Sequence, residues 1–98
     1  MSRFFILTTD PLLPDQEKQL GEALAPAIWW HWLPNSWLIK DGNETATAAS
    51  IRDTLRQVNI SARCMVLQVT PETWAGATRK DAKGRDMAEW IRNHWDKP

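Results

Sequence analysis

Two strand–helix–strand units follow one another between residues 3 and 69, and their order constrains the fold more than any other feature of the sequence. Phe4 to Leu7 place apolar side chains on both faces of an expected strand over residues 3–9. A helix is predicted over residues 12–25, because Pro14 suits a first helical turn and Pro26 ends the helix. Aromatic and β-branched residues over 27–33 then predict a second strand.

The second unit begins with the other arm of a hairpin. A Pro-Asn-Ser turn over residues 34–36 leads into an expected strand over residues 37–40. Thr45 or Thr47 can cap a helix that ends near Asn59, and residues 63–69 alternate as a fourth strand. Right-handed crossovers then place both helices on one face of a four-stranded antiparallel sheet. The sequence therefore predicts an α+β fold, the ferredoxin-like βαββαβ arrangement, over residues 1–70.

Residues 71–98 differ in character from this unit. Small, polar and charged side chains dominate residues 72–84, and Met87, Trp90, Ile91 and His94 or Trp95 then recur at helical spacing. We expect a loop followed by an added C-terminal helix. This segment can cover the open face of the sheet, packing on the same domain or on a partner subunit.

Composition excludes some classes of protein without naming a partner. The 98 residues carry no net charge at pH 7, so bulk charge predicts no strong attraction to nucleic acid. No apolar run approaches the roughly 20 residues of a transmembrane helix, and residues 4–7 are too short for a secretory signal. Cys64 is the only cysteine, which excludes an internal disulfide. We therefore expect a cytoplasmic protein with no membrane partner.

Two titratable residues are candidates for chemistry. Asp10 follows the first strand, where its carboxylate could reach a metal ion or a polar ligand at the rim of the sheet. Alternatively, Asp10 caps the following helix or its Asp-Pro turn. His31 could act as an acid–base group or contact a nucleobase, whereas the alternative is a structural histidine whose ring is held by a neighbouring group.

The seven tryptophans are the most unusual part of the composition, since the chain has no tyrosine. On the expected second strand, Trp29 and His31 share one face and Trp30 and Trp32 share the other, so one set must point away from the helices. These indoles could stack on bases, or they could pack in a core or at an interface. The predicted interface residues are Trp30, Trp32, Trp37 and Trp90.

Residues 79–85 contain the only basic cluster of the chain. Such a loop can neutralise phosphates, although short charge runs are also common on solvated surfaces. The candidate nucleic-acid-binding residues are Arg79, Lys80, Lys83 and Arg85.

Several short motifs resemble a known family. The segment over residues 4–10, the hairpin over residues 30–39, and the Trp74-Ala75-Gly76 and Glu89-Trp90-Ile91 motifs resemble the SinR-like group of small bacterial ferredoxin-like proteins. That group is similar in fold to the antitoxin endoribonuclease GhoS and to the small dimeric CRISPR-associated nucleases. The resemblance implies that an aspartate ending the first strand, here Asp10, serves metal-dependent cleavage across a dimer axis.

Two functions from different classes follow. The first is an RNA-directed protein of toxin–antitoxin or mobile-element type, which would act as an endoribonuclease through Asp10 and Mg²⁺, with the basic cluster on phosphates and His31 as a second candidate. The second is a non-catalytic interaction module whose tryptophan-rich sheet face binds a partner protein, such as a toxin, or a second copy of the chain. We expect a homodimer in which the tryptophan strands and the C-terminal helix supply the contact.

Overall fold

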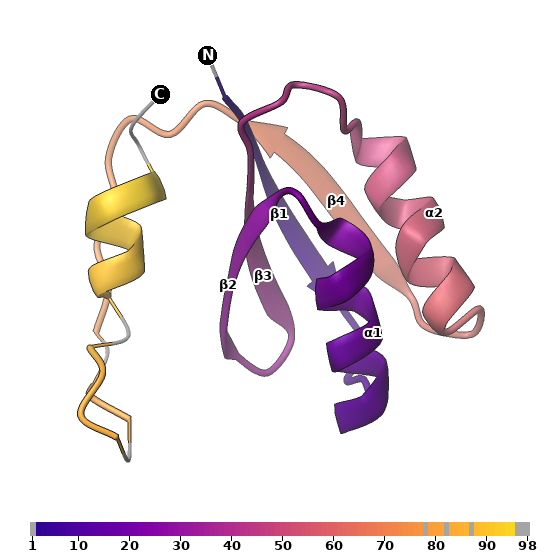
Figure 1. Cartoon of the computed structure of the whole chain (residues 1–98), viewed down its shortest axis with the longest axis horizontal. Coiled ribbons are helices and arrows are strands. Elements are labelled where there is room, and N and C mark those ends of the chain that lie inside the picture. The colour runs from indigo at the N-terminus through magenta and orange to yellow at the C-terminus, as the bar shows by residue number, and fades with distance from the viewer. Residues whose placement is uncertain (1, 78, 82, 87, 96–98) are drawn as a thin grey trace.

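The structure is a computed structural model of the 98-residue chain, and it describes residues 2–77, 79–81, 83–86 and 88–95. In chain order the elements are β1 (Arg3–Thr9), α1 (Pro14–Leu24), β2 (Ile28–Leu33), β3 (Ser36–Asp41), α2 (Ala48–Val58), β4 (Cys64–Val69) and the short π-helix η1 (Ile91–Trp95) (Figure 1). The predicted order of strands and helices is therefore confirmed.

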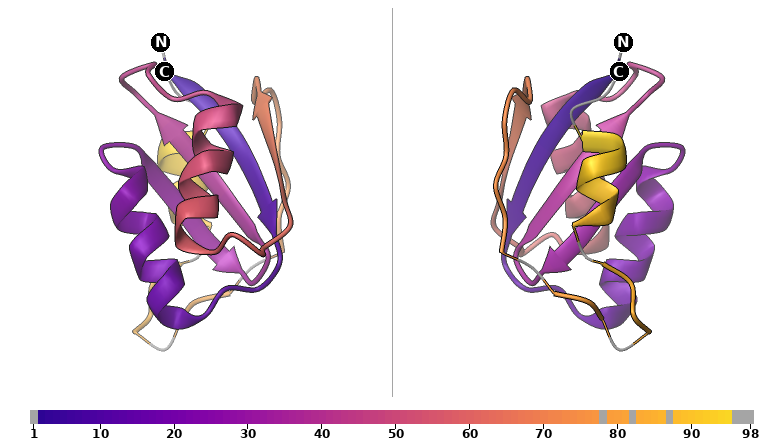
Figure 2. Two further views of the ribbon diagram at one scale, coloured as in Figure 1. Left: turned by 90° about the vertical axis from the view of Figure 1, so that its right-hand side faces the viewer. Right: turned by 90° about the vertical axis from the view of Figure 1, so that its left-hand side faces the viewer.

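The four strands form one antiparallel sheet in the order β2-β3-β1-β4. Both crossing helices, α1 and α2, lie on one face of the sheet, and η1 lies on the opposite face (Figures 1 and 2). This arrangement confirms the ferredoxin-like α+β fold. It also leaves β2 and β4 as the two edge strands, so their outer backbone groups are not paired within the sheet.

Local hydrogen bonds fix where the two helices begin. Helix α1 starts at Pro14, two residues later than predicted, because the backbone N–H of Leu13 donates to the side chain of Gln16 and makes Leu13 the N-cap. Helix α2 is capped by Thr47, whose Oγ1 accepts from the Ser50 amide at 3.0 Å. Of the two candidate caps, the structure therefore uses Thr47.

The helix-covered face holds the main core of the protein, which we call the helix-side core. Its strand residues alternate with residues of the opposite face, and the apolar stripe of each helix packs against them. Leu55 and Phe5 are fully buried within it. The buried members are Phe5, Leu7, Leu20, Leu24, Trp37, Ile39, Ile51 and Leu55.

The opposite face is covered by the C-terminal segment of the same chain, residues 71–95, which we call the tail. Phe4 and Trp30 of the sheet are buried against Ile91 and Trp95 of the tail, and we call this cluster the tail-side core. The rings of Phe4 and Trp95 meet edge to face, with centroids 5.3 Å apart. The described tail residues of this cluster pack on the sheet of the same chain, and a contact with a partner subunit stays a prediction. Met87, part of the predicted final helix, lies outside the described residues.

Candidate functional site

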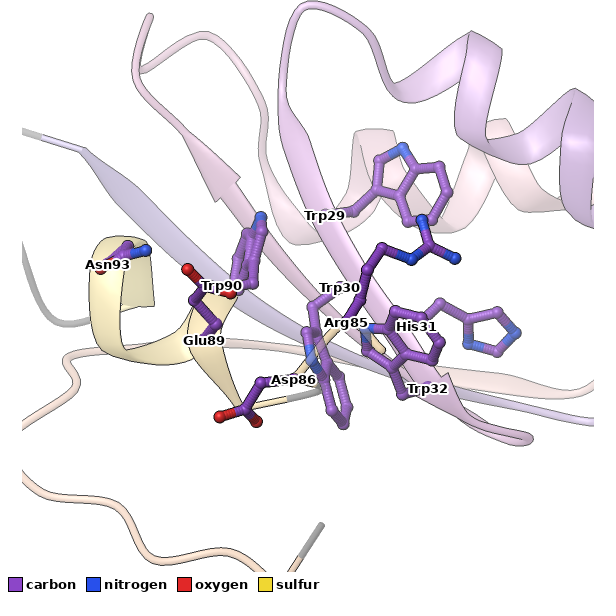
Figure 3. Close-up of a pocket in the computed structure, with 9 residues that line it drawn as sticks. All are labelled: Trp29, Trp30, His31, Trp32, Arg85, Asp86, Glu89, Trp90 and Asn93. Atoms are coloured by element: carbon purple, nitrogen blue, oxygen red, sulfur yellow. The ribbon is translucent and has the colours of Figure 1, made fainter. Parts of the chain in front are cut away.

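A groove of about 520 Å³ runs between β2 and the tail. Four consecutive residues of β2, at positions 29–32, line this groove, and because β2 is an edge strand its outer backbone groups have no strand partner among the described residues. The groove is shown in Figure 3, and its lining residues are Trp29, Trp30, His31, Trp32, Arg85, Asp86, Glu89, Trp90 and Asn93.

Three indoles give the groove its apolar wall. Trp30 and Trp32 point from β2 toward the tail, whereas Trp29 and His31 point to the other side of the strand (Figure 3). Trp30 is buried, while Trp32 and Trp90 remain half-buried and keep part of their rings open to solvent. The alternation expected for this strand is therefore present, and the set that faces away from the helices faces the groove.

Arg85 brings a positive charge onto this wall. Its guanidinium carbon lies 5.3 Å from the centre of the Trp32 ring, and its Nε donates to Asp81 Oδ2 at 2.5 Å. Burial acts to raise the pKa of Asp81, but hydrogen bonds from Arg85 and from the Lys83 amide outweigh it, so the pKa is lowered. Arg85 is thus held beside Trp32 by an ionised carboxylate that lies outside the groove lining.

Two carboxylates of the tail line the other side of the groove. Asp86 accepts hydrogen bonds from Arg92 Nη1 at 2.8 Å and from the Ala88 amide at 2.9 Å, and these donors lower its pKa. Glu89 is exposed at the groove, and no hydrogen bond or ion pair joins its carboxylate to another described residue. Glu89 therefore contributes a carboxylate that is open to a ligand.

His31 is held on the helix-covered side of β2. Its Nδ1 lies 2.9 Å from the carbonyl oxygen of Ser36, which can only accept, so Nδ1 carries the hydrogen. Its Nε2 contacts a carboxylate oxygen of Glu17 on α1, and the ring stacks on Trp37 at 4.0 Å with an interplanar angle of 9°. These contacts engage both ring nitrogens and match the structural alternative for His31 rather than an acid–base role.

Trp29 lies near His31 and joins β2 to helix α1. Its Nε1 donates to the carbonyl oxygen of Gly21 at 3.3 Å. A Cβ atom at Gly21 would come within 2.6 Å of the Trp29 ring, so this close approach requires glycine. Together with the Glu17–His31 contact, it fixes the inner side of β2 and leaves the outer side facing the groove.

The structure corrects part of the predicted interface. Trp37 is 1% exposed and belongs to the helix-side core, because it lies opposite Leu7 in the β1–β3 register and so shares the helix-covered face. Trp30 is 5% exposed and is covered by the tail of its own chain. Of the four tryptophans predicted to form an interface, only Trp32 and Trp90 keep accessible ring surface.

Asp10 lies at a different place, at the end of β1. Its Oδ2 accepts from the amide and from Nε of Arg63 at 2.9 and 3.0 Å, and its Oδ1 accepts from Arg63 Nη2 at 3.1 Å. The side-chain hydrogen bonds from Arg63 lower the pKa of Asp10. Asp10 therefore ties β1 to the start of β4, a role that neither the metal nor the capping interpretation anticipated.

This ion pair bears on the expected Mg²⁺ site. Both carboxylate oxygens of Asp10 already accept hydrogen bonds from the Arg63 guanidinium, whose positive charge opposes a cation at the same carboxylate. Within the described residues, no group of three or more His, Cys, Asp and Glu side chains could hold a metal ion. The Arg63 charge disfavours Mg²⁺ at Asp10 within one chain, the site shared by two subunits stays a prediction, and His31 lines a different pocket.

The basic cluster is divided by the structure. Arg79, Lys80 and Lys83 are exposed beside the groove but do not line it, whereas Arg85 does. Lys80 pairs with Asp86 in an isolated antiparallel bridge, which brings Arg85 back against Trp32. The sequence did not predict Asp86, Glu89 or the outer edge of β2 as parts of a site. The one available signal was that Glu89 directly precedes Trp90 in the expected final helix.

No protein family, curated protein or solved structure matches the chain. The resemblance to SinR-like proteins therefore stays a prediction. None of the helices among the described residues combines the length and apolar character that a membrane crossing requires. The functional conclusion rests on the geometry of the groove.

Proposed function

We propose that the chain is a non-catalytic protein-interaction module whose groove binds an extended segment of a partner protein. The observation that carries this proposal is the position of the groove, which runs along the open edge of β2 and beneath a wall of indoles. Extended peptides bind such edges by adding a strand, and their backbone hydrogen bonds supply affinity while side-chain pockets supply specificity.

The dimensions and composition of the groove support this proposal. Its volume, about 520 Å³, lies in the range of sites that enclose small ligands or a few peptide side chains. Trp32 and Trp90 offer large, rigid contact surfaces that lose little conformational entropy on binding. The inner face of β2 is fixed by His31 and Trp29, so the strand edge is preorganised for a partner.

RNA binding is the second candidate, and one specific observation favours it. Three exposed cations of the tail, Arg79, Lys80 and Lys83, lie next to a groove that contains accessible indoles. Basic side chains beside stacking aromatic rings are typical of surfaces that bind single-stranded nucleic acid. This candidate needs no catalytic role for Asp10.

A peptide-display selection tests the proposal directly. Random twelve-residue peptides are selected on the folded protein, and the enriched peptides are then measured against variants. Trp32→Ala and Trp90→Ala should weaken binding at least severalfold, because they remove contact surface from the wall. The matched control is Met65→Ala, which removes an exposed apolar side chain from β4 at the other edge of the sheet.

Two outcomes would contradict this proposal. Peptides that bind the Met65→Ala variant weakly and the tryptophan variants normally would place the binding surface on β4. If no peptide is enriched while a single-stranded RNA octamer binds with strong salt dependence, the RNA candidate replaces the interaction module. Sedimentation of the protein alone at micromolar concentration shows whether the partner segment comes from a second copy, as the predicted homodimer requires.

A further inference from the structure

We infer that the groove recognises a basic segment, with an arginine or lysine side chain of the partner bound on the indole faces of Trp32 and Trp90 and opposite Glu89. This inference rests on the proposed function and names the chemistry of the partner. It follows from the contacts of Arg85, the cation that already lies in the groove, and from the charges that line the groove.

The resident cation shows what the wall can accept. The guanidinium of Arg85 lies over the Trp32 ring at 5.3 Å, within the distance at which the ring quadrupole attracts a cation. The Arg85 side chain is 64% exposed, and its ion pair is with Asp81, outside the groove lining. Because Arg85 lies over the Trp32 ring, an incoming cation would have to displace it from that ring.

The remaining charges of the groove favour a cation over an anion. Arg85 is compensated by Asp81, and Asp86 is compensated by Arg92. Glu89 has no such partner among the described residues, so it is the carboxylate left uncompensated in the lining. A phosphate placed here would meet Glu89 and the negative faces of the indoles, whereas an arginine side chain would meet complementary charge.

The exposed cations of the tail do not reverse this balance. Arg79, Lys80 and Lys83 are exposed and lie outside the lining, and the charge of Lys80 acts on Asp86, whose pKa it helps to lower, so it adds to the compensation of that carboxylate and does not compensate Glu89 directly. Their effect on a bound segment is therefore weaker than that of a carboxylate within the groove. A basic partner segment is the occupant that the lining fits.

The test uses two blocked pentapeptides that differ only in charge. One carries a central arginine between two valines, and the other carries citrulline, which keeps the shape of arginine but is neutral. Binding is followed by the indole Nε1–H signals of Trp32 and Trp90 in nitrogen-edited NMR spectra. We expect the arginine peptide to bind about two- to fivefold more tightly than the citrulline peptide, as an exposed cation–π contact predicts.

Variants of the groove sharpen this test. Glu89→Gln should bring the two peptides to similar affinity, because it removes the carboxylate that favours the cation. Arg85→Ala should strengthen binding of the arginine peptide, because the resident cation no longer occupies Trp32. Arg79→Ala, which removes a neighbouring cation outside the lining, is the matched control and should leave the affinity ratio unchanged.

The outcomes separate this inference from the proposed function. Equal binding of the arginine and citrulline peptides would overturn the inference and leave the interaction module intact. Weaker binding of the arginine peptide to Arg85→Ala would also overturn it. If neither pentapeptide binds and display selection yields no peptide, both the inference and the proposed function fail. An RNA octamer that binds wild type and loses affinity in Arg85→Ala would assign the groove to an anionic ligand.

Discussion

On the helix-covered face of the sheet, two regular helices bury the core residues almost completely, and Leu7, Leu20, Ile39 and Leu55 have no exposed surface. On the opposite face, a largely irregular tail covers the strands with aromatic side chains, and Phe4, Trp30, Ile91 and Trp95 keep 5–8% of their surface exposed. The same four strands therefore carry a closed core with several fully buried residues on one side, and on the other a slightly less buried core that lies beside an open groove.

The difference shows where a binding site can form in so small a domain. Regular helices present continuous apolar stripes that interlock with a sheet and leave little space between the layers. The tail instead contacts the sheet through separate large rings, and the space that they leave beside β2 is the groove. We therefore expect stability to be concentrated on the helix-covered face, and the proposed binding surface lies on the tail-covered face.

The largest expected effect tests the closed side of this comparison. Leu55→Ala removes a fully buried side chain from the helix-side core, so we expect the free energy of unfolding to fall by about 2–5 kcal/mol. Urea denaturation followed by circular dichroism measures it. The controls are Arg52→Ala and Arg56→Ala on the exposed face of α2, which should each change stability by less than about 0.5 kcal/mol. If either arginine variant lowered the free energy of unfolding as much as Leu55→Ala, the assignment of the buried and exposed faces of α2 would be wrong.

The next effect tests the open side. Trp95→Ala removes the ring that packs on Phe4, and we expect a smaller loss of about 1–3 kcal/mol, because the tail can detach while the helix-side core stays folded. Hydrogen exchange should show lost protection in the tail and unchanged protection in α2. If both regions lose protection together, the two faces form one cooperative unit and the comparison fails.

Much of the fold could be predicted because local patterns determine it. The alternation in residues 3–9 and 63–69, the apolar stripe of α2 and the prolines around α1 all depend on neighbours in sequence. Handedness rules then left few topologies for this order of elements. The boundaries of α1 were less accurate, because the cap depends on the hydrogen bond between Leu13 and Gln16.

The site could be predicted only in part, because its contacts join residues far apart in sequence. Asp10 pairs with Arg63 across 53 positions, and no local pattern connects them. Trp37 was predicted at an interface because the sequence does not show which alternate residues of β3 face the helices. The register of β3 with β1 determines which face of the sheet each residue occupies. Arg85 reaches Trp32 through the fold of the tail, which lies beyond any periodicity of the strands.

A smaller effect concerns the link that holds β2 between the two faces. Glu17→Gln keeps the size of the side chain but removes the charge that contacts His31 Nε2, so we expect a loss of about 1 kcal/mol in urea denaturation. Glu22→Gln, on an exposed position of the same helix, is the control and should have no measurable effect. A Glu17→Gln loss no larger than that of Glu22→Gln would show that the contact does not fix β2.

The smallest effect lies at the rim where β1 ends, and it distinguishes the structural from the catalytic interpretation of Asp10. Because Arg63 lowers the pKa of Asp10 in the folded state, the carboxylate stabilises the fold above the pKa of the unfolded chain, roughly pH 4. That stabilisation is lost as the pH falls through the folded pKa.

We therefore expect Asp10→Asn to be slightly less stable than wild type at pH 7, and the difference to disappear below about pH 4. Thermal unfolding across this pH range measures the difference, and Asp53→Asn on exposed α2, whose carboxylate pairs with its neighbour Arg52, is the control. A difference between wild type and Asp10→Asn that persists at low pH would mean that charge is not the cause. Mg²⁺-dependent RNA cleavage by wild type, lost in Asp10→Asn, would show that the carboxylate leaves Arg63 to bind a cation and would restore the endoribonuclease hypothesis.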